Sequence, residues 1–203
     1  MSRGSPLLTG RARFSACGQY RWWLERCWQP GAPRLLFIGL NPSRADAGRD
    51  DPTLRRLLGC ARGWGYGALE VLNLFAAISP SPAALRRRAD PVGGLNDAWI
   101  RRRLAATAPA ALWLGWGAGG GWRGRDRAVL QLLGGRRLLA LGLTRGGHPR
   151  HPLYLPAGLH LQPWSSDGWR APIGLGHCEA AAASPAAHAP CPPTRGATPF
   201  TCT

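Results

Sequence analysis

The apolar run from Leu35 to Leu40 is the feature that most constrains the fold, because its side chains show no polar alternation. A strand with apolar side chains on both faces must be covered on both faces, as in the parallel sheets of α/β proteins. The run ends in the turn formers Asn41, Pro42 and Ser43. Ligands of open α/β sheets bind at the carboxyl ends of the strands, so this turn predicts a binding site.

Further apolar runs of the same kind alternate with amphipathic segments along the chain. Such alternation implies a parallel sheet with right-handed crossovers. We therefore predict an α/β fold, a three-layer sandwich around a central, mostly parallel four-stranded sheet. The expected strands are 34–40, 68–75, 110–116 and 137–143, and the expected helices are 52–62, 97–106 and 126–133, with a short helix or turn at 83–88.

Two residues mark where predicted helices begin. Asp51, followed by Pro52, is a typical helix start because Pro is tolerated in the first turn. Asn96 is the expected N-cap of the helix over 97–106. The pair Asp50 and Asp51 also has the ligand type that Mg²⁺ prefers, although capping acids near a helix N-terminus are the more common case.

The length of 203 residues fits one domain with a tail. We expect a frayed N-terminus at 1–13 and a single α/β domain at 14–167. Residues 168–203 are rich in Ala, Pro and Gly and have almost no periodicity. This composition predicts a disordered tail.

An aromatic stripe lies ahead of the first predicted strand. Tyr20, Trp23, Leu24 and Trp28 recur at a spacing that predicts one face of a helix, with the charged residues between them on the other faces. Such a stripe is usually core or a cap over a sheet edge. The alternative is a platform for stacking bases.

The formal net charge of +16 comes from Arg alone, because the sequence contains no Lys. Arg favours phosphate and other planar, bidentate partners, so DNA or a nucleotide is a possible partner. A chain rich in Ala, Gly, Pro and Arg is equally typical of GC-rich coding. The charge therefore leaves both explanations open, and it does not indicate an oligomeric state.

Several classes of protein and site find no support in the sequence. The six Cys form no Cys-x-x-Cys pair, so we expect no zinc or iron–sulfur site and no cofactor. No apolar signal-peptide region follows Met1, and no stretch of about 18 apolar residues could span a membrane. We expect a cytoplasmic protein.

Polar or small residues lie near or just after the carboxyl end of each predicted strand, and parallel strands bring these ends to one edge of the sheet. The group consists of Asn41 and Ser43, Asn73, the glycines 117–121, and His148 with His151. Singly, each has a common structural role, such as a satisfied amide or a loop hydrogen bond. The glycines could form an anion nest, but no phosphate-loop or dinucleotide motif accompanies them.

A set of short motifs runs in order along most of the chain: Phe14-Ser-x-Cys-Gly-x-Tyr-Arg21, Gly39-Leu-Asn-Pro-Ser-x-Ala-Asp46, Asp50-Asp-Pro-Thr-x-Arg-Arg56, Trp64-Gly-Tyr-Gly67, Asn73-Leu-Phe-Ala76, Trp116-Gly-Ala118 and Gly147-His-Pro-x-His-Pro-Leu-Tyr-Leu155. Together they resemble a bacterial family known as domain of unknown function 1643. The resemblance covers about residues 14–156. It implies no activity, since that family is defined without one.

The Gly-x-Asn-Pro motif at Asn41 also resembles the uracil-DNA glycosylase superfamily, which implies a uracil-DNA-glycosylase-like fold. By this resemblance Asn41 positions water, Asn73 binds the base and His151 is the motif histidine. Leu153 and Tyr154 match the residues that wedge into the duplex. The chain departs from the pattern twice: Asn41 replaces the Asp of the fastest members, and no Ser follows the Pro after His151.

The resemblance implies a base flipped out of the stack into a pocket. Asn73 offers a donor and an acceptor to the base edge, and His151 donates to the oxygen where charge develops. Asn41 orients water but takes no proton, which predicts a slow enzyme or none. Further expected contacts are Ser43, Trp64, Tyr66 and His148 to the substrate, and Arg44, Arg49 and Arg150 to phosphates.

The sequence leaves three classes of function open. The first is a glycosylase-like hydrolase of a base–sugar bond. The second is a non-catalytic nucleotide or nucleic-acid binding module on the same fold. The third is a small-molecule enzyme, or an accessory protein of a toxin–antitoxin or phage-defence system, which no residue supports directly.

Overall fold

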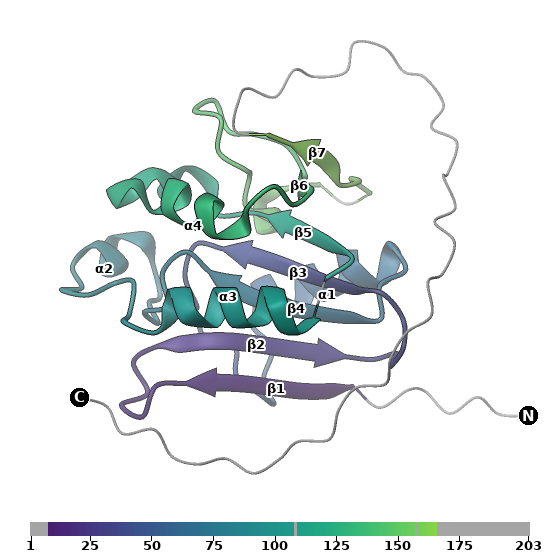
Figure 1. Cartoon of the computed structure of the whole chain (residues 1–203), viewed down its shortest axis with the longest axis horizontal. Helices are drawn as coiled ribbons and strands as arrows, with labels where there is room; N and C mark the ends of the chain where they lie inside the picture. Colours follow the sequence, from purple (N-terminus) through teal and green to yellow (C-terminus); the bar gives the residue numbers. More distant parts are fainter. Residues whose placement is uncertain (1–7, 108, 157, 166–203) are drawn as a thin grey trace, which may run out of the picture.

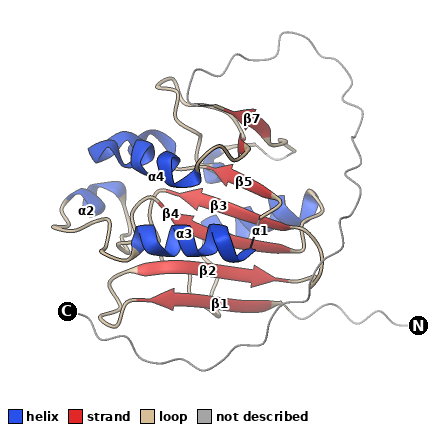
Figure 2. Ribbon diagram, viewed as in Figure 1, coloured by secondary structure: helices blue, strands red, loops and turns tan. Residues whose placement is uncertain are grey.

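The computed structural model describes residues 8–107, 109–156 and 158–165. The predicted tail at 168–203 lies outside these residues. Within them the chain forms a mixed α/β fold with one seven-stranded sheet and four α-helices (Figures 1 and 2). The strands are β1 Thr9–Phe14, β2 Arg21–Cys27, β3 Arg34–Gly39, β4 Ala68–Asn73, β5 Ala111–Leu114, β6 Leu138–Ala140 and β7 Gln162–Trp164.

The predicted helices are confirmed, with ends that differ by one or two residues from the expected bounds. They are α1 Pro52–Gly63, α2 Pro82–Arg86, α3 Asn96–Thr107 and α4 Arg125–Leu133. Two 3₁₀ segments, η1 Gly117–Gly124 and η2 Pro152–Tyr154, follow β5 and β6 along the chain. No helix in the described part of the chain is long and apolar enough to cross a membrane.

The middle of the sheet is parallel. Strands β4, β3, β5 and β6 are neighbours in that order, and each pairs with the next in parallel. Between β3 and β4 the register places Gly39 opposite Asn73. The carboxyl ends of β3 and β4 therefore meet at one edge of the sheet, and the turn at Asn41 begins there.

The sheet is wider than the predicted four strands. The hairpin of β1 and β2 extends one side, with β2 antiparallel to β4, and β7 pairs antiparallel with β6 on the other side (Figure 1). The helix predicted from Tyr20 to Trp28 is wrong, because Arg21–Cys27 is a strand. Strand β1 begins at Thr9, inside the segment 1–13 that was expected to be frayed.

The helix prediction was wrong because it assumed that the charged residues of this segment face water. The Glu25 carboxylate is buried in an ion pair with Arg34. Beside it, Glu70 of β4 is 1% exposed and accepts hydrogen bonds from Trp23 Nε1 at 2.8 Å and Arg103 Nε at 2.8 Å. A strand buried on both faces thus carries charge that is neutralised inside the fold.

Helices cover both faces of the sheet. On one face α3 and α4 enclose a core around Ile38, Ile100 and Val129. On the other face α1 covers a core that includes Phe37 and Leu57. In Figure 1, α3 and α4 lie in front of the sheet and α1 lies behind it. We call these the α3 face and the α1 face.

The two predicted helix starts have different outcomes. Asp51 is the N-cap of α1, as predicted, and its Oδ1 accepts from the backbone N–H of Leu54 at 2.8 Å. Asn96, the expected N-cap of the next helix, is instead its first residue. Its Nδ2 donates to the backbone oxygens of Asn73 and Leu74 at 3.1 and 2.9 Å, so it joins α3 to the end of β4.

We predict that Glu70→Ala lowers the free energy of unfolding by about 3–5 kcal/mol, because it removes the buried acceptor of a charged network. Urea unfolding followed by circular dichroism measures the change. Arg101→Ala on the exposed side of α3 is the control and should shift the value by less than about 0.5 kcal/mol. A loss below about 1 kcal/mol for Glu70→Ala would show that the network contributes little.

Candidate functional site

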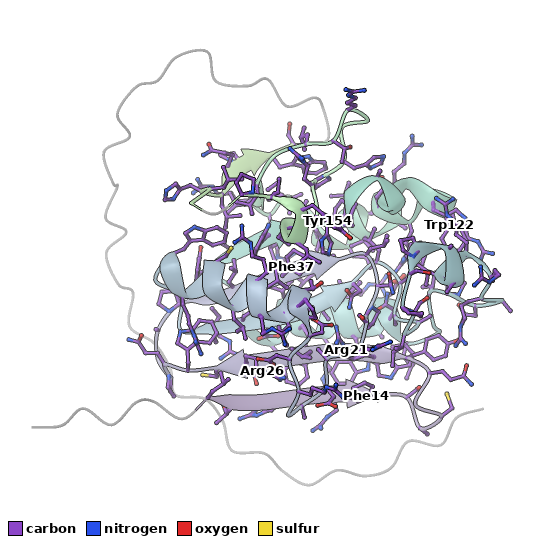
Figure 3. The ribbon with its side chains drawn as sticks, turned by 180° about the vertical axis from the view of Figure 1, so that it is seen from behind. Phe14, Arg21, Arg26, Phe37, Trp122 and Tyr154 are labelled. Carbon is purple, nitrogen blue, oxygen red and sulfur yellow. The ribbon has the colours of Figure 1, made fainter. Side chains whose placement is uncertain are left out.

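A cavity of about 700 Å³ opens at the carboxyl ends of the central strands on the α1 face. Its inner wall is apolar and comes from β2, β3, β4 and α1. Figure 3 views the molecule from this face and labels Phe37, Arg21 and Tyr154. The apolar lining side chains are Leu24, Phe37, Leu54, Leu57 and Val71.

Seven of the residues that the sequence placed at the site line this one cavity, although they are far apart in the chain. They come from the turn after β3, the end of β4, and the loop that leads into η2. The convergence at a sheet edge expected from parallel strands is therefore present. These residues are Asn41, Ser43, Asn73, Arg150, His151, Leu153 and Tyr154.

Asn73 is the most deeply placed polar residue of this group. Its side chain is buried, and no hydrogen bond within the described residues uses its carboxamide; Nδ2 is wholly enclosed without a partner. A Cβ at Gly39 would lie only 3.0 Å from its Oδ1, so a glycine is needed beside it. A buried amide without a partner is costly, and a ligand that satisfies it recovers that energy.

Asn41 has a structural bond as well as a place at the site. Its Nδ2 donates to the backbone oxygens of Pro42 and Ser79 at 2.9 and 3.0 Å. The amide thereby ties the turn after β3 to the loop that precedes α2. Both protons of the amide are used, so Asn41 can offer a ligand or a water its Oδ1 only.

His151 caps η2 and lines the cavity. Its Nδ1 accepts from the backbone N–H of Leu153 at 3.3 Å. In the neutral ring the proton is then on Nε2, which leaves Nε2–H as a donor. Burial lowers the pKa of His151 below its ordinary value of 6.5, and the nearby charge of Asp51 partly offsets that effect. At neutral pH the ring is therefore an uncharged donor.

Arg21 and Asp51 line the cavity, and the sequence did not assign either of them a role there. Arg21 was expected on an outer face of a helix. Asp51 was expected as a cap or a metal ligand, and its position after the loop that follows the first strand was a signal that could have found it. Its Oδ1 caps α1, and the second oxygen has no hydrogen bond within the described residues.

Arg21 reaches the cavity because of a bulge in β2. Arg13 pairs with Trp23 and Phe14 pairs with Arg21, so Trp22 has no partner in β1. One extra residue reverses the alternation of the strand. Trp22 then stacks on Tyr20, with ring centres 5.3 Å apart, and Arg21 turns to the α1 face, where its Nη1 donates to Ala45 O at 2.8 Å.

Three of the predicted substrate contacts do not line the cavity. Trp64 and Tyr66 pack at the far end of the core on the α1 face, and Trp64 Nε1 donates to Leu159 O at 3.2 Å. Burial raises the pKa of Tyr66. His148 lies near α4, with its Nδ1 3.5 Å from a carboxylate oxygen of Asp126.

The predicted phosphate contacts divide in the same way. Arg150 lines the cavity and is exposed at its mouth. Arg44 and Arg49 are exposed on the loop after β3, outside the cavity lining. Contact of Arg44 and Arg49 with nucleic acid stays a prediction.

The loop acids and the glycines have structural roles. Asp50 pairs with Arg26 at 2.7 Å. The described residues contain no group of three or more His, Cys, Asp or Glu that could hold a metal ion. The glycines predicted as an anion nest form η1, and the N–H of Gly117 donates to Pro149 O at 2.7 Å. Gly117 and Gly119 line the cavity as a wall.

Residues 21–153 match the model of a family described as a protein of unknown function, DUF1643. The chain belongs to this family. The match extends from Arg21 to Leu153, so it includes nearly all of the cavity lining. No curated protein and no solved structure matches the chain. The resemblance to uracil-DNA glycosylases therefore stays a prediction.

We predict that His151 titrates below pH 6.5 in the folded protein. Since the unfolded chain then binds the proton first, the free energy of unfolding should fall as the pH drops through 6.5 toward the folded pKa. Asp51→Asn should lower the pKa of His151 further, because it removes the charge that raises it. NMR titration of the imidazole carbons measures both values. A midpoint at or above 6.5 would contradict the burial of the ring.

Proposed function

We propose that this cavity binds a nucleobase and that the protein hydrolyses the bond between the base and its sugar. The observation that carries the proposal is the unpartnered carboxamide of Asn73, buried in a cavity whose inner wall is apolar. A flat base presents polar groups at its edge and apolar faces above and below. The cavity offers the complement of both.

The size and the polarity of the cavity support this ligand class. Small-molecule sites measure roughly 300–1,000 Å³ and combine apolar walls with a few placed polar groups. The cavity, at about 700 Å³, lies inside that range. A base edge that pairs with Asn73 would satisfy its Nδ2, which has no partner among the described residues, and such a bond is worth about 1–3 kcal/mol.

The residues around this amide can support hydrolysis. Water supplies a hydroxyl to the sugar carbon and a proton to the departing base. As the bond breaks, negative charge develops on the base, and the Nε2–H of His151 is the donor for it. Two acceptors can hold the water: Oδ1 of Asn41, and the carboxylate oxygen of Asp51 that does not cap α1.

The mouth of the cavity has an exposed aromatic side chain. Tyr154 is 79% exposed and Leu153 is 38% exposed, and both line the opening beside Arg150. Large exposed apolar side chains at a cavity mouth are typical of contact with a partner. In DNA they would fill the space that a flipped base leaves, as apolar wedges do.

A non-catalytic binding module is the second candidate, and the bonding of Asn41 favours it. Both amide protons of Asn41 are used in the turn, so this residue holds water by a single acceptor. A cavity in which Asn73 binds the base but no residue activates water would bind a nucleoside without hydrolysing it. The two candidates differ in product formation.

We predict that the purified protein releases free base from nucleotides or from uracil-containing single-stranded DNA, measured by chromatography. His151→Ala should slow release by at least about a hundredfold, as expected for the loss of a donor to developing charge. The double variant Asn41→Ala with His151→Ala should be inactive. The control is His160→Ala, an exposed histidine outside the cavity, which should change the rate by less than about twofold.

Three results would contradict part or all of this proposal. Base release that survives in the double variant would show that the reaction occurs elsewhere. Binding of nucleosides without release would support the binding module. Failure of every nucleoside, nucleotide and oligonucleotide to bind at low salt would exclude both candidates.

A further inference from the structure

Arg21 is a buried cation whose charge no carboxylate in the described part of the chain neutralises through a salt bridge. Its side chain lines the cavity and is 5% exposed, and its Nε has no hydrogen-bond partner. Burial lowers its pKa to about 10; the charges of Asp51 and Asp46 partly offset that effect and the charge of Arg26 adds to it, so Arg21 stays cationic at neutral pH. A buried charge without a direct ion pair is costly to keep in a fold.

The other buried arginines show how this fold normally handles such a charge. Arg26 pairs with Asp50 at 2.7 Å and also donates to Asp46 O. Arg125 pairs with Asp97 and donates to Leu74 O. Each has its counter-ion inside the protein. Arg21 differs because, among the described residues, its side chain donates only to the neutral oxygen of Ala45.

The cavity around Arg21 has excess positive charge. Arg21, Arg86 and Arg150 line it against the single carboxylate of Asp51 among the described residues. One oxygen of Asp51 is already used as the helix cap. The bulge at Trp22 is what turns Arg21 from the α3 face to this cavity, and bulges that re-aim a side chain are frequent beside binding sites.

We propose that Arg21 forms an anion subsite that binds the phosphate of a free nucleoside monophosphate, while Asn73 binds the base of the same molecule. This inference rests on the proposed function and narrows its substrate class. The guanidinium offers a planar fork of donors, which matches a phosphate with two oxygens. The phosphate supplies the direct ion pair that Arg21 lacks among the described residues.

A terminal phosphate fits this position better than the backbone of a nucleic acid. Arg21 is enclosed by the protein, whereas Arg44, Arg49 and Arg150 are exposed and can meet a backbone at the surface. A phosphodiester carries a sugar on both sides, so to reach Arg21 it must bring a second nucleotide into the cavity. A monophosphate ends at the phosphate and enters alone.

The test compares ligand pairs on the full chain by isothermal titration calorimetry. Deoxyuridine monophosphate and deoxyuridine form one pair. For each of the other common bases, the nucleoside monophosphate and its nucleoside form a further pair. The wild-type protein should bind the preferred monophosphate about tenfold to a hundredfold more tightly than its nucleoside. This is the gain in affinity expected from one buried charge-assisted hydrogen bond between Arg21 and the phosphate. Arg21→Met should abolish this difference and leave nucleoside affinity within about threefold.

Controls separate this effect from misfolding. Arg21→Met replaces an unneutralised charge by an apolar side chain of similar length, so the variant should stay folded by circular dichroism. Arg21→Lys keeps the charge and loses the fork, and should retain part of the preference for the monophosphate. Arg127→Met, at an exposed position of α4 outside the cavity, should bind both ligands as the wild type does.

The outcomes also distinguish this inference from the proposed function. If nucleosides do not bind but inorganic phosphate binds the wild type and not Arg21→Met, the anion subsite stands and the base site fails. If Arg21→Met and Arg21→Lys both bind monophosphates as tightly as the wild type, the subsite is overturned. Tighter binding of a uracil-containing oligonucleotide than of any monophosphate, unchanged in Arg21→Met, would overturn it in favour of DNA.

Discussion

The ion pair between Arg26 and Asp50 fixes the loop that closes one side of the cavity. Arg26 is 2% exposed, and its fork donates to Asp50 at 2.7 Å and to the backbone oxygen of Asp46 at 2.7 Å. The loop thus lies against β2, and Asp51, the next residue, begins α1 with its carboxylate at the cavity. The interaction links the antiparallel side of the sheet to the turn of the parallel strands, where the polar residues gather.

The parallel part of the fold was predictable, because its strands are short apolar runs and its helices have marked ends. Asp51 and Pro52 gave the start of α1 correctly. The hairpin of β1 and β2 was not predictable in the same way. Its charged residues are neutralised by partners outside the hairpin, since Glu25 pairs with Arg34 and Arg26 pairs with Asp50, and no local pattern reveals such partners.

The candidate site was predictable where residues follow parallel strands, since topology alone brings Asn41, Asn73 and the His151 loop to one edge. It was not predictable at Arg21. That side chain reaches the cavity because a one-residue bulge in β2 reverses which side chains face the cavity. Nothing in the sequence marks the position of this bulge. Trp64 and His148 belong to recognisable motifs, but their side chains pack outside the cavity.

The central claim is that one cavity holds both a base and a phosphate. A crystal structure of the full chain with deoxyuridine monophosphate, or with the monophosphate that it binds best, tests this most directly. The account predicts the phosphate within hydrogen-bond distance of Arg21, the base edge on the Asn73 carboxamide and the base plane against Phe37. A bound nucleotide outside this cavity, or one whose phosphate and base both point away from Arg21 and Asn73, would contradict it.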